Sequence, residues 1–273
     1  MIALNTVVIA DDPFDSEGTW KNSYYHMTTT PAFSLTIDTD WAPDPLIEMT
    51  REYLDAAGTT ATFFVTNETT VNFGRHEVAL HPNINGLLAE GTPIAQQLVA
   101  LKQLFPNARG IRGHSLCNST RYYPDLAQAG MVYESSHLQY GVHDLRPYWM
   151  IEGIVQLPMF FEDDLHMDLA ARYGHKRFSL EALDLMRGGL KIFDFHPVHL
   201  FLNTDDLSRY TSSKEHYHDP ERLAAFRNTD SPGVRTFFGE LLEWFTAHHI
   251  TPLPLGSIVD AWKSQQEKEL GGV

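Results

Sequence analysis

The sequence predicts an α/β fold, an irregular (β/α) barrel of seven or eight strands. Apolar runs typical of strands alternate along the chain with segments that have the periodicity of amphipathic helices. The candidate catalytic side chains fall at the carboxyl ends of the predicted strands, where barrels of this type hold their active sites. The 273 residues, of which 43% are hydrophobic, suffice to form a core of that size.

The first predicted strand covers residues 32–40. Because side chains alternate between the two faces of a strand, Phe33, Leu35 and Ile37 form an apolar face. The opposite face is polar and acidic, and it consists of Ser34, Thr36, Asp38 and Asp40. Further strands are predicted at residues 60–66, 77–81, 110–115, 131–135, 154–161, 190–196 and 251–255. Helices are predicted at residues 44–57, 92–105, 124–129, 179–186 and 233–249, and from residue 257 onward.

The domain organisation and the bulk composition narrow the class of protein. Residues 1–30 are predicted to form an irregular arm, and residues 31–273 a single domain. The amino terminus has no basic segment and no apolar run is long enough to span a membrane, so we expect a cytoplasmic protein. The single cysteine, Cys117, excludes an intramolecular disulfide. The net charge of −15 repels phosphates and anionic lipids, so nucleic acid and membranes are not expected partners.

Two groups of side chains in the first half of the chain suggest metal chemistry. Asp38 and Asp40 lie two residues apart on one strand, so one can bind a cation while the other holds a proton. A solvated acidic pair at a strand end is the alternative. His81 follows an apolar strand and precedes a proline, and it is either a metal ligand or a hydrogen-bonded turn histidine. Arg112 and His114 share a strand face, where Arg112 either orients an aspartate or forms a structural ion pair.

Two further groups lie in the second half of the chain. Asp194 and His196 face the predicted barrel interior, and a histidine at a strand end near carboxylates is suited to act as a general acid. His199 lies beyond that strand and out of phase with it, which favours a structural role. Asp163 and Asp164 follow another predicted strand, where either one orients a catalytic histidine or both belong to a solvated loop.

These motifs, in this order, resemble the polysaccharide deacetylase superfamily, also called NodB-homology proteins or carbohydrate esterase family 4. The resemblance covers roughly residues 32–200 and rests on the Asp38/Asp40 strand followed by the Ala-Thr-Phe-Phe-Val-Thr strand at residues 61–66. The blocks Phe-Asp-Phe-His-Pro at 193–197 and Arg-Gly-His-Ser at 112–115 are similar to deacetylase-related proteins of surface polysaccharide biosynthesis. The resemblance implies a NodB-like barrel.

The resemblance also implies a metal site. Asp40 would be a ligand and His81 would be the first histidine of the family's His-(Ser/Thr)-x-x-His motif. The second histidine would fall at position 85, where this chain has Asn85. The third ligand is therefore either Asn85 or His114, and we favour His114 because imidazole binds zinc-like ions better than an amide does. The expected cofactor is a divalent metal, Zn²⁺ first, with Co²⁺, Ni²⁺, Fe²⁺ or Mn²⁺ as alternatives.

The resemblance finally implies catalytic roles. Asp38 would be the general base, Arg112 would pair with it, and His196 would protonate the leaving amine, steadied by Asp163 or Asp164. The expected reaction removes an acyl group, N-acetyl first, from an amino sugar or a polysaccharide precursor. A catalytically degenerate relative that binds a sugar or a partner is one alternative. A deformylase or another amidohydrolase is the other. The sequence makes no prediction of oligomeric state.

Overall fold

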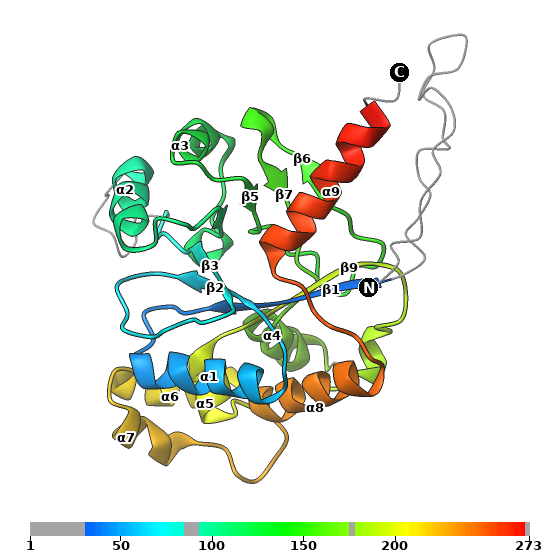
Figure 1. Ribbon diagram of the computed structural model, residues 1–273. Helices are drawn as coiled ribbons and strands as arrows, with labels where there is room; N and C mark the ends of the chain where they lie inside the picture. Colours follow the sequence, from blue (N-terminus) through cyan, green and yellow to red (C-terminus); the bar gives the residue numbers. More distant parts are fainter. Residues whose placement is uncertain (1–30, 85–92, 175–177, 271–273) are drawn as a thin grey trace.

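The computed structural model describes residues 31–84, 93–174 and 178–270 of the chain (Figure 1). The predicted arm at residues 1–30 and the alternative ligand Asn85 lie outside the described residues. Among the described helices, none combines the length and the apolar character that a membrane span requires.

Strands and helices alternate along the described residues. The strands are β1 (Pro31–Asp38), β2 (Thr62–Val65), β3 (Glu77–Leu80), β4 (Gly110–Ile111), β5 (Tyr133–Glu134), β6 (Tyr148–Trp149), β7 (Val155–Gln156), β8 (Phe161–Glu162) and β9 (Gly189–Phe195). The helices are α1 (Asp44–Ala56), α2 (Ile94–Leu104), α3 (Tyr123–Gln128), α4 (Asp163–Tyr173), α5 (Pro197–Leu202), α6 (Leu207–Ser213), α7 (Pro220–Leu223), α8 (Val234–Ala247) and α9 (Leu255–Leu270).

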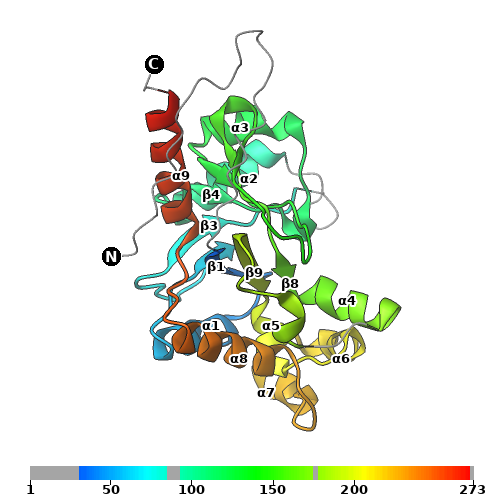
Figure 2. The ribbon, with the colours of Figure 1, turned by 90° about the vertical axis from the view of Figure 1, so that its right-hand side faces the viewer.

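The strands form one sheet in the order β6-β7-β5-β4-β3-β2-β1-β9-β8, which is parallel except for the β6–β7 pair. Residues 157–160 alone separate β7 from β8, and Met159 bridges Leu138 beyond β5. Because β7 pairs with β5 and β8 pairs with β9, this segment connects the two ends of the parallel sheet. The sheet therefore curls into the irregular barrel that the sequence predicts (Figure 2).

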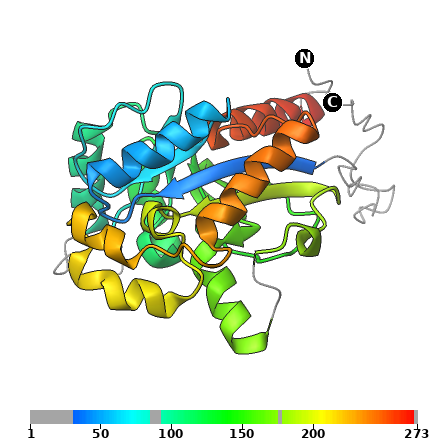
Figure 3. The same ribbon diagram turned by 90° about the horizontal axis from the view of Figure 1, so that it is seen from below.

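Helices cover the outer side of the curled sheet. Figure 3 shows α1 and α8 lying across the face formed by β1 and β9. Phe33 of β1 packs edge-on against Phe245 of α8 at a ring-centroid distance of 5.2 Å, and Phe195 of β9 packs against Phe238 at 4.8 Å. The odd-numbered residues of β1 thus face the helices, as predicted, and the even-numbered Thr36 and Asp38 face the barrel interior.

Several predicted elements differ from the structure. The strand predicted at 110–115 ends at Ile111, and His114–Leu116 form a 3-10 turn. The strand predicted at 154–161 is divided into β7 and β8. Residues 251–255 do not form a strand, because Pro252 and Pro254 have no N–H to donate to a ladder, although Leu253 N–H still donates to Phe33 O at 2.9 Å. The helix predicted at 179–186 is reduced to a 3-10 turn that ends at left-handed Asp184.

Gly110 allows the barrel interior to close around Tyr133. A Cβ atom at position 110 would lie 1.9 Å from the ring atom Cζ of Tyr133. The ring cannot move freely, because it is buried and its hydroxyl donates to Glu77 Oε1 at 3.0 Å. A side chain at position 110 would therefore displace packed atoms.

We predict that Gly110→Ala lowers the free energy of unfolding by about 1–3 kcal/mol through overpacking. Gly239→Ala on α8 is the matched control, since a Cβ there meets no heavy atom within 4 Å and alanine favours a helix by about 0.5–1 kcal/mol. Urea unfolding followed by circular dichroism measures both. Equal stability of the two variants would show that Tyr133 does not pack as described.

Candidate active site

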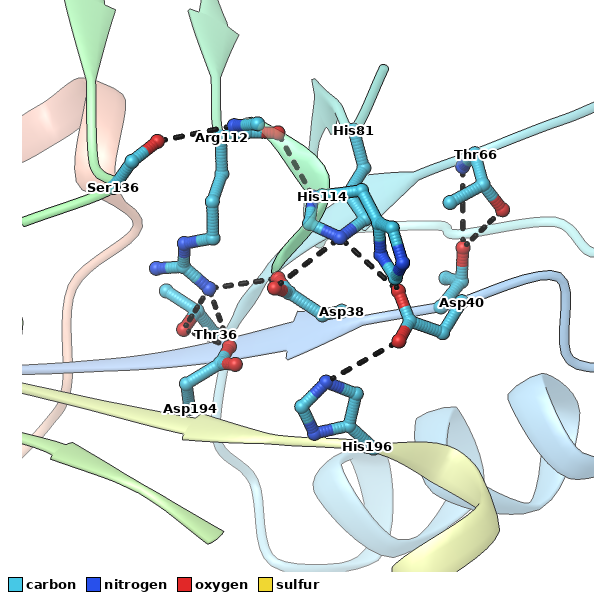
Figure 4. Close-up of polar contacts among 12 residues, drawn as sticks. Thr36, Asp38, Asp40, Thr66, His81, Arg112, His114, Ser136, Asp194 and His196 are labelled. Carbon is cyan, nitrogen blue, oxygen red and sulfur yellow. Dashed lines mark hydrogen bonds and ion pairs between the residues drawn. The ribbon is translucent and has the colours of Figure 1, made fainter. Parts of the chain in front are cut away.

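The candidate site residues converge at one end of the barrel. Asp38 ends β1, His81 follows β3, Arg112 follows β4 and His196 follows β9. Figure 4 shows their side chains pointing toward a common centre, with Asp40 between His81, His114 and His196. The parallel strands produce this arrangement, because their carboxyl ends lie at the same edge of the sheet.

Asp40, His81 and His114 form the centre of the cluster. Asp40 Oδ1 lies 3.1 Å from His81 Nε2 and 3.0 Å from His114 Nδ1. One ligand atom from each of the three side chains lies within 4.8 Å of the others. His81 Nδ1 donates to the carbonyl oxygen of Arg112 at 2.8 Å, which fixes the ring and, in the neutral imidazole, leaves Nε2 as the unprotonated nitrogen. This donor set is suited to a divalent metal ion.

The backbone at Asp40 departs from the predicted strand. Asp40 and Trp41 have φ angles of 44° and 57°, in the left-handed region that few non-glycine residues adopt. The Tyr217 hydroxyl donates to Asp40 O at 2.8 Å and holds the turn. Asp38 and Asp40 therefore reach the same centre through a turn that follows β1, and simple strand alternation does not account for it.

Burial alone would raise the pKa of Asp40. The neighbouring imidazoles of His114, His81 and His196 outweigh burial and hold the pKa of this carboxyl well below its ordinary value. The carboxylate is therefore ionised and available as a ligand.

Arg112 is completely buried and connects β1, β9 and the segment that follows β5. Its Nη1 donates to Asp38 Oδ1 at 2.7 Å, to Thr36 Oγ1 at 3.0 Å and to Asp194 Oδ1. Its Nε donates to Ser135 O at 2.7 Å. Arg112 thus holds one oxygen of Asp38, whose second oxygen, Oδ2, lies 3.5 Å from His81 Nε2.

Asp194 shares this guanidinium and received no role from the sequence. Burial, followed by the charge of Asp38, raises the pKa of Asp194 to about 7 even though Arg112 opposes the shift. Its Oδ2 is buried and has no hydrogen-bond partner in the described part of the chain. The pairing of an interior aspartate with the interior arginine is the signal that would have identified it.

His196 and Asp163 form a histidine–carboxylate pair beside the cluster. Asp163 Oδ1 accepts from His196 Nδ1 at 2.7 Å, and Asp163 Oδ2 accepts from the His196 backbone N–H at 2.9 Å. His196 Nε2 then faces Asp40 Oδ2 at 3.6 Å. Burial would lower the pKa of His196, but the charge and hydrogen bond of Asp163 outweigh it and hold the pKa well above its ordinary value.

Asp164 contacts a different histidine. Its Oδ1 lies 2.8 Å from Nε2 of His199, which is buried and whose Nδ1 lies 3.0 Å from Thr204 Oγ1. Asp163 and Asp164 open α4 instead of lying in an acidic loop. His199 is out of phase with β9, as predicted, because it lies on α5. The alternation of side chains along a strand does not identify His199 as a site residue, because His199 belongs to a helix and helical geometry directs its side chain toward the site.

The chain matches a known family over a range of residues that includes this site. Residues 35–214 match the family model described as WbmS-like polysaccharide deacetylase, which is more than half of the 273 residues. The chain belongs to this family. No curated protein matches the sequence.

Solved structures of several organisms are similar to this polysaccharide deacetylase family member. A candidate polysaccharide deacetylase involved in O-antigen biosynthesis, from Bordetella bronchiseptica, is 31% identical, with a TM-score of 0.68 over 77% of this chain and 89% of that chain. A candidate polysaccharide deacetylase from Mycobacterium smegmatis is 19% identical, with a TM-score of 0.44 over 82% of this chain and 93% of that chain. A carbohydrate esterase family 4 pseudoenzyme from Bacillus anthracis is 13% identical, with a TM-score of 0.44 over 85% and 65%. The predicted family and NodB-like fold are confirmed.

We predict that Arg112→Met lowers the free energy of unfolding by about 3–5 kcal/mol, because it leaves buried Asp38 and Asp194 without their cation. Arg172→Met on α4 is the control, since that side chain is 67% exposed and its ion pair is worth about 0–1 kcal/mol. Adding Asp194→Asn to Arg112→Met should recover part of the loss in urea unfolding. No recovery would contradict the electrostatic explanation.

Proposed function

We propose that this chain is a metal-dependent hydrolase that removes an acyl group, N-acetyl first, from an amino sugar or a polysaccharide precursor. The observation that carries the proposal is the convergence of Asp40, His81 and His114 within 4.8 Å, with Asp38 and His196 on either side. One carboxylate and two imidazoles match the ligand preferences of Zn²⁺. Co²⁺, Ni²⁺, Fe²⁺ and Mn²⁺ accept the same donors.

The donor set fits a metal ion on this structure's own geometry. Asp40 is ionised, and its Oδ1 faces a nitrogen of each imidazole. A divalent ion held there would polarise the acyl carbonyl and lower the pKa of an attacking water. A second histidine at position 85 is not required for this set, because His114 supplies the second imidazole. This supports an enzyme over a catalytically degenerate relative, the alternative for which Asn85 is the main evidence.

Asp38 is proposed as the general base. Arg112 holds its Oδ1 and so directs Oδ2 toward the metal ligands, where it can accept a proton from the attacking water. His196 is proposed as the general acid on the other side of Asp40. Asp163 keeps the Nδ1 proton of His196 in place and stabilises the imidazolium, so Nε2 can donate a proton to the departing amine.

The proposal predicts that the wild-type protein loaded with Zn²⁺ releases acetate from N-acetylated hexosamines or their nucleotide-linked forms. Asp38→Asn should lower kcat by about 100-fold to 10,000-fold, because it removes the proton acceptor. The variant should keep its zinc, since Asp38 is not one of the three ligands. Coupled acetate detection and metal analysis provide the two measurements.

Asp168→Asn on the surface of α4 is the control for this experiment, and it should match wild type. Parallel assays with N-formylated sugars separate deacetylation from deformylation. Asp38→Asn with full activity would contradict the base assignment. A zinc-loaded wild type that releases no acyl group from either series would contradict the proposed function and favour the degenerate relative.

A further inference from the structure

Asp164 is a partly exposed carboxylate at the edge of the site that the proposed chemistry does not use. Its side chain is 44% exposed. Oδ1 contacts His199 Nε2 at 2.8 Å, and Oδ2 has no hydrogen-bond partner among residues 31–84, 93–174 and 178–270. A position in the first turn of α4 accounts for an acidic residue there, but it does not account for a buried histidine that holds the carboxylate.

His199 fixes Asp164 in one orientation. The imidazole is enclosed by Thr204, whose Oγ1 lies 3.0 Å from Nδ1, and by the Tyr210 ring at a centroid distance of 5.1 Å. Burial would lower the pKa of His199, but the charge of Asp164 outweighs it and raises the pKa. The pKa of Asp164 is lowered in turn, although its own burial opposes the shift. The carboxylate is therefore both held and ionised.

Tyr210 of α6 brings a second polar group to the same place. Helices α4 and α6 are in contact (Figure 2). The Tyr210 ring packs edge-on against His199 at a centroid distance of 5.1 Å, and burial, followed by the charge of Asp164, raises the pKa of its phenol. Within the described residues this hydroxyl has no hydrogen-bond partner. The His199 ring, which contacts Asp164, lies 5.1 Å from the Tyr210 ring and 5.7 Å from the ring of His196, measured between ring centroids.

We propose that Asp164 and Tyr210 bind hydroxyl groups of the sugar ring that carries the amide, with His199 as the positioning residue for Asp164. This inference rests on the proposed function. A hydroxyl donates to an ionised carboxylate in a charge-assisted hydrogen bond, and a tyrosine hydroxyl can both donate and accept. Such polar groups at the margin of a pocket fix the orientation of a ligand. The sugar ring would thus lie on the α4–α6 side, with its amide over the metal ligands.

The test measures sugar binding directly, separately from catalysis. N-acetylglucosamine and N-acetylgalactosamine are titrated into the full chain loaded with Zn²⁺, and Kd is obtained by ligand-observed NMR. Asp164→Asn should raise Kd about tenfold to a hundredfold, because it removes a hydrogen bond to a charged group. Tyr210→Phe, which keeps the ring against His199, should raise Kd by about tenfold or less. Asp168→Asn, one turn along α4, should match wild type.

A double-mutant cycle tests the positioning role of His199. His199→Asn should raise Kd in the wild-type background but have little further effect when Asp164 is already asparagine, because the two residues act as a unit. Additive effects would indicate a general structural defect and overturn the positioning role.

The proposed sugar-binding role of Asp164 is overturned if Asp164→Asn binds both sugars as tightly as wild type, or if wild type binds neither sugar. Failure of the proposed function has a different signature. Wild type would bind the sugars and Asp164→Asn would weaken that binding, but no acetate would be released.

Discussion

The buried guanidinium of Arg112 is the interaction on which the site depends. It is the shared partner of Asp38, Asp194 and Thr36, which come from β1 and β9, and it also contacts the chain beyond β5 through Ser135. Two buried carboxylates without a cation would cost several kcal/mol. With Arg112 in place, the interior of the barrel can hold acidic groups at the position where the proposed hydrolysis needs a base. The same contact directs the free oxygen of Asp38 toward His81.

Around this ion pair, the two histidines that follow β9 each contact an acid from the start of α4. Asp163 orients His196 toward Asp40, and Asp164 is itself held by His199 at the edge of the site. The two pairs thus differ in which partner positions the other. In the first pair the carboxylate is buried and positions the histidine, whereas in the second the histidine is buried and positions a carboxylate that faces solvent.

Strand periodicity predicted most of the barrel and most of the site, because interior side chains at strand ends leave a pattern of alternation. Asp38, His81, Arg112 and His196 belong to that pattern. Asp40 reaches the centre through a left-handed turn fixed by Tyr217, a contact across 177 positions that no local pattern encodes. The helices that follow β8 and β9 were missed because α4 opens on an acidic run and α5 is short. The roles of Asp194 and His199 depend on those tertiary contacts.

The central claim is that a metal ion is held by Asp40, His81 and His114, although Asn85 occupies the place of the family's second histidine. The most direct measurement is a crystal structure of the zinc-loaded protein with anomalous diffraction recorded at the zinc edge. We expect one zinc peak with Asp40, His81 and His114 at bonding distances of about 2.0–2.2 Å. Zinc bound through Asn85 with His114 turned away, or no zinc at this site, would contradict it.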